Sequence, residues 1–132
     1  HPLADPRTDG FQDIWSGWVS SGKEVFVIKD VPPTQGEDVP SCLATNPDHR
    51  LACSTSATEI PEDASEDAVV AMREPRVHLI DLTDRFCDRT TCYPVVGDLI
   101  VYGDTSHLTT DYAEALAPYL SERVDELVGA GG

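Results

Sequence analysis

An aspartate and a histidine three residues apart, Asp104 and His107, are the pair in this chain whose types and spacing best suit chemistry. An apolar run at 99–102 precedes them, and a long amphipathic segment starting near Thr110 follows. We therefore expect them at the junction of a strand and a helix. In such a pair the histidine is a general base and the aspartate fixes its tautomer and orientation. The pattern predicts the base half of a catalytic triad, although no activated serine or cysteine is evident.

The composition is that of an acidic chain able to form a packed core. With 132 residues we expect one domain or part of one. Hydrophobic residues make up 40%, which excludes a disordered chain. The net charge of −15 makes nucleic acid and anionic membranes poor partners. No membrane-spanning run or signal peptide is visible, and the start at His1 rather than methionine suggests a mature product or an excised piece.

Four cysteines form two local pairs, each spanning a loop rich in proline or aspartate. They are Cys42 with Cys53, and Cys87 with Cys92. Their even number and local pairing predict two disulfides and so an oxidising compartment. A metal site and free thiols are the alternatives, but the spacings are not those of a zinc ribbon. No histidine spacing suggests a metal site either, and we expect no metal and no cofactor.

The first part of the chain has the pattern of an α/β unit. Apolar residues at helical spacing predict a helix with one buried face and both tryptophans directed to the core. These residues are Phe11, Ile14, Trp15, Trp18 and Val19. The apolar run at 24–28 predicts a strand buried on both faces, as in a parallel sheet. A helix followed by a buried strand is half of an α/β unit.

The middle of the chain is predicted as a long loop followed by a helix and a strand. Residues 30–60 contain four prolines and the first cysteine pair, so we expect a disulfide-stapled loop at the end of the first strand, where α/β sheets bind ligands. A short helix is expected at 61–72 and a strand at 76–82. His78 lies inside that strand, and a structural role is expected for it. Asp81 and Asp84 are either turn residues or part of a cleft.

The last part predicts a hairpin and a terminal helix. Two short strands are expected at 93–96 and 99–102, around a Gly97-Asp98 turn. A C-terminal helix is expected at 108–128. Pro118 falls inside its pattern and should kink the helix or split it in two.

The C-terminal part of the sequence resembles a known family. The run Asp104-Thr105-Ser106-His107-Leu108-Thr109, with Tyr112-Ala113 and Leu116-Ala117-Pro118 after it, is similar to the last block of SGNH (GDSL-type) hydrolases. More narrowly, it resembles the SGNH domain fused to bacterial acyltransferase-3 membrane proteins, which O-acetylate cell-surface glycans. Asp30 to Pro33, Pro40 to Leu43, and Ile80 to Leu82 leading to the second cysteine pair agree in order. The resemblance covers about residues 11 to 127.

The resemblance implies a flavodoxin-like α/β three-layer sandwich, of which residues 1–132 would be a single, partial domain representing the C-terminal portion. It assigns the triad aspartate and histidine to Asp104 and His107. The Gly-Asp-Ser nucleophile block and the oxyanion-hole blocks are not found. Gly103-Asp104-Thr105-Ser106-His107 itself looks like a nucleophile block, but such a block opens the domain, and only one helix follows here. Ser106 is therefore interpreted as a bystander.

Two functional hypotheses follow. In the first, the chain is the base-bearing portion of an extracytoplasmic SGNH esterase or O-acyltransferase, periplasmic or at the bacterial cell surface, that acts on glycan esters. Its serine would be supplied from outside this chain. The expected partner is an N-terminal half or a membrane acyltransferase domain of the same protein, and a missing N-terminal region would tether the domain to the membrane. In the second, it is a non-catalytic SGNH-like module that binds glycan or protein. A Gly-Asp-Ser block upstream of His1 in the native gene would favour the first.

Overall fold

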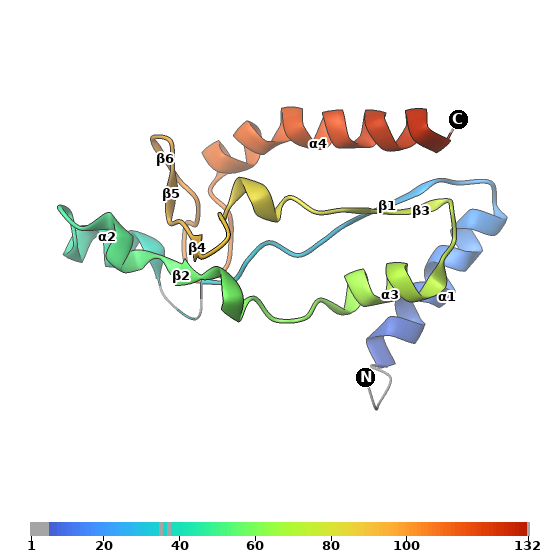
Figure 1. Ribbon diagram of the computed structural model, residues 1–132, viewed down its shortest axis with the longest axis horizontal. Helices are drawn as coiled ribbons and strands as arrows, with labels where there is room; N and C mark the ends of the chain where they lie inside the picture. The colour runs from blue at the N-terminus through green and yellow to red at the C-terminus, as the bar shows by residue number, and fades with distance from the viewer. Residues whose placement is uncertain (1–5, 35, 37, 132) are drawn as a thin grey trace. The chain divides into compact units, whose positions relative to one another are not determined.

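The computed structural model describes residues 6–34, 36 and 38–131, so the ends of the predicted domain lie partly outside it (Figure 1). The chain forms two compact units. We call His1–Asp30, Glu62–Asp81 and Leu120–Gly132 the strand-pair unit, and Val31–Pro61 with Leu82–Tyr119 the disulfide unit. No helix in the described ranges has both the length and the apolarity needed to cross a membrane.

The strand-pair unit is built on two parallel strands, β1 (Val25–Ile28) and β3 (Val77–Ile80), paired from Val25↔Val77 to Ile28↔Ile80. Helices α1 (Pro6–Ser20) and α3 (Ala64–Met72) pack on each other and on these strands. Alternate strand residues face the helices, because side chains point to opposite faces along a strand. The resulting core contains Trp15, Val25, Val27, Ala68 and Val77. The predicted helix, strand and parallel pairing are confirmed here.

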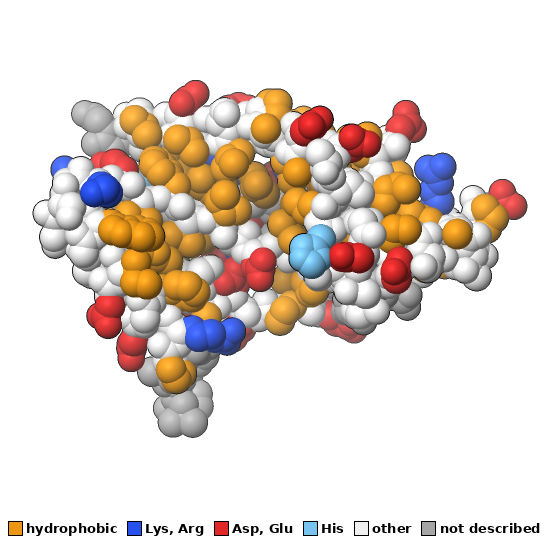
Figure 2. All heavy atoms as spheres, turned by 180° about the vertical axis from the view of Figure 1, so that it is seen from behind, with side chains coloured by type: hydrophobic (Ala, Val, Ile, Leu, Met, Phe, Trp, Pro, Cys, Tyr) orange, Lys and Arg blue, Asp and Glu red, His pale blue; other side chains and the backbone are white. Residues whose placement is uncertain are grey.

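Two expectations about burial in this unit are wrong. Trp15 is 6% exposed, whereas Trp18 is 48% exposed. Phe11, Trp15 and Val19, at intervals of four, form the line that packs into the core, and Trp18 lies further round the helix. Ile28 is also half exposed, so β1 is not buried on both faces. Hydrophobic side chains consequently reach the surface in several patches (Figure 2).

The disulfide unit has only short strands, but it buries side chains such as Phe86, Val101 and Tyr112 and contains two cross-links. Cys42 bonds to Cys53 and Cys87 bonds to Cys92, as predicted, and neither the metal-site nor the free-thiol alternative applies. Two antiparallel pairs add to this unit. They are β2 (Thr55–Ser56) with β4 (Thr91–Cys92), and β5 (Val95–Val96) with β6 (Leu99–Ile100). The second pair is the predicted hairpin, and Gly97 takes φ +60 at its turn, a value that favours glycine.

The segment at 30–60, expected as a loop, contains helix α2 (Val39–Thr45), short 3₁₀ helices η1 (Arg50–Cys53) and η2 (Ala57–Glu59), and strand β2. The Asp38 carboxylate caps α2 by accepting from the Ser41 N–H at 3.1 Å. Pro40 stands in the first turn, where its missing N–H needs no partner. Pro40, one of the prolines that suggested a loop, therefore marks the start of a helix.

The C-terminal helix, α4, runs from Thr110 to Gly131 without interruption. Of the two expected effects of Pro118, the split is wrong, and the kink stays a prediction. Pro118 removes one N–H and lies on the exposed side, so the carbonyl left without a helical partner has access to water. A third 3₁₀ helix, η3 (Thr83–Arg85), precedes the Cys87–Cys92 loop.

Candidate functional site: the Asp104–His107 turn

Asp104 organises a tight turn between β6 and α4, in the disulfide unit. Its Oδ1 accepts two backbone hydrogen bonds, from the N–H of Ser106 at 2.8 Å and of His107 at 2.7 Å. The N–H of Gly103 donates to the His107 carbonyl at 2.8 Å and closes the turn. Aspartate favours this geometry because its short side chain can cap backbone N–H groups two and three residues ahead.

The second carboxylate oxygen of Asp104 holds the histidine ring. His107 Nδ1 lies 2.9 Å from Asp104 Oδ2. Because an ionised carboxylate only accepts hydrogen bonds, the neutral form of the ring carries its proton on Nδ1 and its free lone pair on Nε2. The His107 side chain is 82% exposed, and Nε2 has no hydrogen-bond partner within the described ranges. The structure thus brings together the two predicted site residues and leaves the basic nitrogen open.

Hydrogen bonding keeps the Asp104 carboxylate charged. The backbone N–H of His107, then that of Ser106, and then the His107 ring lower the pKa of Asp104 to about 2. A carboxylate that stays ionised at all ordinary pH values fixes the ring tautomer and favours the imidazolium formed when Nε2 takes a proton. The turn therefore has the chemistry of a general base and its orienting group.

Ser106 is placed on the wrong side of the ring to be activated. Its Oγ lies 3.4 Å from His107 Nδ1, the nitrogen already held by Asp104. A serine nucleophile passes its proton to the nitrogen opposite the aspartate. This geometry supports the interpretation of Ser106 as a bystander.

The segment before α2 supports the turn, and this was not predicted. The Thr34 hydroxyl donates to the Thr105 carbonyl, and the Val39 N–H donates to the Asp104 carbonyl at 3.5 Å. The Tyr102 hydroxyl donates to the Pro32 carbonyl. Thr34 is only 3% exposed. A polar residue directly after Pro32-Pro33 was the available signal, but its partner is far away in sequence.

Comparison with known families decides what kind of domain holds this turn. The family model described as "SGNH domain (fused to AT3 domains)" matches residues 7–122. The chain belongs to the SGNH family. No curated protein and no solved structure matches it. The family match, the parallel strand pair and the two disulfides confirm the predicted α/β fold class. At the level of the family, this SGNH domain is a hydrolase- or acyltransferase-like module.

Other titratable residues of the SGNH domain have local structural contacts. His78 stacks on Phe26 with ring centroids 4.9 Å apart, and its Nε2 lies 2.7 Å from Glu24 Oε2. Asp81 lies 3.7 Å from Lys29 Nζ. Asp84 lies exposed in η3. No group of three or more metal-ligating side chains occurs in the part of the chain that the structure describes.

Proposed function

We propose that this SGNH domain supplies the base half of a Ser-His-Asp acyl-transfer site acting on ester-linked acyl groups of extracytoplasmic glycans. The observation that carries the proposal is the Asp104–His107 pair, with Nδ1 held at 2.9 Å by an ionised carboxylate and Nε2 open. His107 is the general base, Asp104 orients it, and the nucleophilic serine comes from outside these 132 residues.

The reaction conserves protons through His107. Nε2 takes the serine hydroxyl proton as the serine oxygen attacks the acyl carbonyl carbon. The imidazolium returns that proton to the departing alcohol oxygen as the donor ester bond breaks, which leaves an acyl-serine. A sugar hydroxyl or water then gives its proton to Nε2 and attacks the acyl-serine, and the imidazolium returns that proton to the serine oxygen as its bond to the acyl group breaks. Asp104 stays ionised throughout and stabilises each imidazolium.

The family description and the cross-links support the proposed setting of this reaction. The family is described by fusion to AT3 domains, which supports a membrane acyltransferase domain as the partner. Two disulfides in a chain with no free cysteine among its described residues fit an oxidising, extracytoplasmic compartment, periplasmic or at the cell surface. The charge of −15 makes nucleic acid an unsuitable partner.

The proposal is tested with His107→Ala and Asp104→Asn in the full natural protein. Each should lower glycan acylation or deacylation by about 10³–10⁴-fold, because a serine without an oriented base is a poor nucleophile. Acyl groups on the isolated glycan are measured by mass spectrometry.

Ser106→Ala is the matched control, since it removes a hydroxyl from the same turn and keeps the backbone N–H that Asp104 uses. It should retain activity. Full activity in His107→Ala would remove the triad assignment and favour a non-catalytic binding module. Loss of activity in Ser106→Ala would make Ser106 the nucleophile instead.

A further inference from the structure

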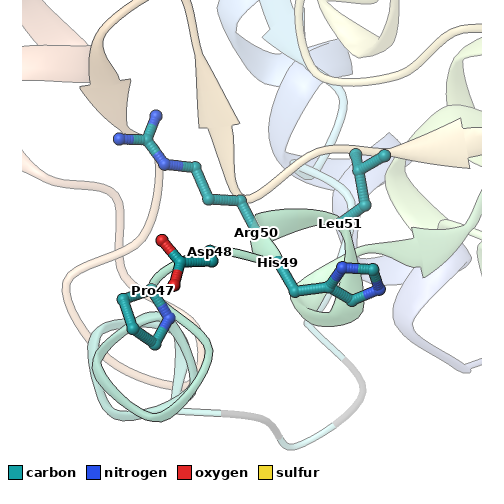
Figure 3. Close-up of a pocket in the computed structure, with 5 residues that line it drawn as sticks. All are labelled: Pro47, Asp48, His49, Arg50 and Leu51. Carbon is teal, nitrogen blue, oxygen red and sulfur yellow. The ribbon is translucent and has the colours of Figure 1, made fainter.

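Two adjoining hollows in the disulfide unit share Pro47 and Arg50. One, of about 320 Å³, lies in the turn that joins α2 to η1 and is lined by residues 47–51 (Figure 3). The other, of about 430 Å³, is a groove between α2 and the β5–β6 hairpin. Its lining comprises Pro40, Leu43, Ala44, Pro47, Arg50, Val95, Asp98 and Ile100. Ligand pockets typically have volumes of about 300–1,000 Å³, so the groove is large enough for a small ligand.

The two charges of the groove stand on different walls. Arg50 comes from the α2–η1 side and Asp98 from the hairpin turn. Figure 3 shows Arg50 and Asp48 extending to one side of the turn, and His49 and Leu51 to the other. Within the described ranges neither Arg50 nor Asp98 forms an ion pair, whereas Lys29 and Arg76 do. The groove therefore presents a donor-only group and an acceptor-only group that do not satisfy each other.

The rest of the groove is apolar and held in place. Pro40, Leu43 and Ala44 of α2 lie on one wall, and Val95 and Ile100 on the other. The Cys42–Cys53 bond brackets α2 and η1, so the backbone that carries Arg50 is closed into a short covalent loop. A fixed backbone lowers the entropy that a binding site loses when its ligand is ordered.

One wall is hydrogen-bonded to the Asp104–His107 turn, and the other to Thr109 just after it. On the α2 side, the Val39 N–H donates to the Asp104 carbonyl at 3.5 Å. On the hairpin side, the Thr109 hydroxyl donates to the Ile100 carbonyl at 2.6 Å. Val39 is adjacent to Pro40 of the groove, and Ile100 itself lines it. A ligand lying in the groove is therefore held by the same elements that position the histidine.

We infer that this groove binds an uncharged sugar residue of the glycan, an inference that rests on the proposed function and names its substrate class. A sugar hydroxyl both donates and accepts, so it can accept from Arg50 while donating to Asp98. The apolar walls suit the C–H faces of a sugar ring. An acidic sugar would satisfy Arg50 but meet Asp98, Asp48 and the overall charge of −15.

The test is binding of short sugars to the 132-residue chain, followed by backbone amide NMR. The probes are uncharged trisaccharides of glucose, galactose, mannose and N-acetylglucosamine, with trigalacturonate as the acidic comparison. At least one uncharged probe should give saturable shifts confined to α2, η1 and the hairpin. Arg50→Met and Asp98→Asn should each weaken that binding by about tenfold, the effect of losing one hydrogen bond to a charged group.

Arg89→Met and Asp84→Asn are the matched controls, because both residues are exposed and lie outside the groove. They should bind as the native chain does, and spectra without sugar show whether each variant is folded. The inference is overturned if no uncharged probe gives saturable shifts, if trigalacturonate binds more tightly, or if the shifts lie elsewhere. His107→Ala should still bind sugar, so a failure of the acyl-transfer proposal is distinguishable from a failure of the groove.

Discussion

The two units of this SGNH domain differ in what accompanies their buried side chains. The strand-pair unit buries tryptophan, valine and alanine side chains between two helices and two parallel strands. The disulfide unit has strands of only two residues each and relies on Cys42–Cys53, Cys87–Cys92 and on tyrosine hydroxyls that donate to backbone carbonyls. Both units bury apolar side chains, and the disulfide unit, whose buried side chains include Phe86, Val101 and Tyr112, adds cross-links and polar contacts to the backbone.

This difference bears on where the candidate chemistry lies. The Asp104–His107 turn and the groove are both in the disulfide unit. Open turns and exposed polar side chains are needed for binding and proton transfer, but they contribute little burial. Covalent cross-links supply order without requiring that such surfaces be buried.

The largest expected effect tests the packing of the strand-pair unit. Trp15→Ala should lower the free energy of unfolding by about 3–5 kcal/mol, because it removes a large buried side chain and leaves a cavity. Trp18→Ala, on the same helix but half exposed, should cost under about 1 kcal/mol. Urea unfolding followed by circular dichroism measures both. Equal losses would show that Trp18 is packed and that the described core is incomplete.

The next effect tests the cross-linked unit. Replacing Cys42 and Cys53 by serine should cost about 2–4 kcal/mol and increase hydrogen exchange in α2 and η1 more than in β1 and β3. Replacing Cys87 and Cys92 should cost roughly 0.6 kcal/mol less than replacing the first pair. The second disulfide closes a loop about half as long, with a sequence separation of 5 rather than 11. A uniform rise in hydrogen exchange across both units would show that the Cys42–Cys53 bond does not act locally on α2 and η1.

The smallest effect concerns acid stability of the Cys87–Cys92 loop. The Tyr93 hydroxyl and the N–H groups of Thr90 and Thr91 lower the pKa of Asp88 from 3.8 to about 2. A lowered pKa in the folded state stabilises the protein above the ordinary value, and this stabilisation is lost as pH falls from 3.8 through about 2. Asp88→Asn should therefore reduce the slope of stability against pH in this window, measured by urea unfolding. An unchanged slope would show that Asp88 does not contribute to acid stability.

The features that the sequence predicted well depend on short-range patterns. Apolar runs bounded by glycine or aspartate identified β1 and β3, and the local cysteine spacing identified both disulfides. The Asp104–His107 hydrogen bond spans three residues, so its geometry is set largely within the motif itself. Their catalytic role stays a prediction.

The features that were missed depend on long-range packing or on ambiguous residues. Helical spacing predicted a buried Trp18 because it groups five apolar residues on one helix face. Helix α3 and the strands contact only part of that face, which leaves Trp18 half exposed. Helix α2 was hidden because proline marks both loops and helix starts. Thr34 and its Thr105 partner are 71 residues apart, and the Arg50–Asp98 groove joins two separate segments. Contacts between segments so far apart in the chain cannot be predicted from one sequence.

The carboxylate bonding of the Asp104 turn is local, whereas its backbone carbonyls also accept hydrogen bonds from Thr34 and Val39. Each hydrogen bond that Asp104 makes through its carboxylate goes to Ser106 or His107, and Gly103 closes the turn on His107. The orientation of the ring is thus encoded in five consecutive residues. Insertions or fusions made away from this turn, Thr34 and Val39 should leave the aspartate–histidine hydrogen bond intact.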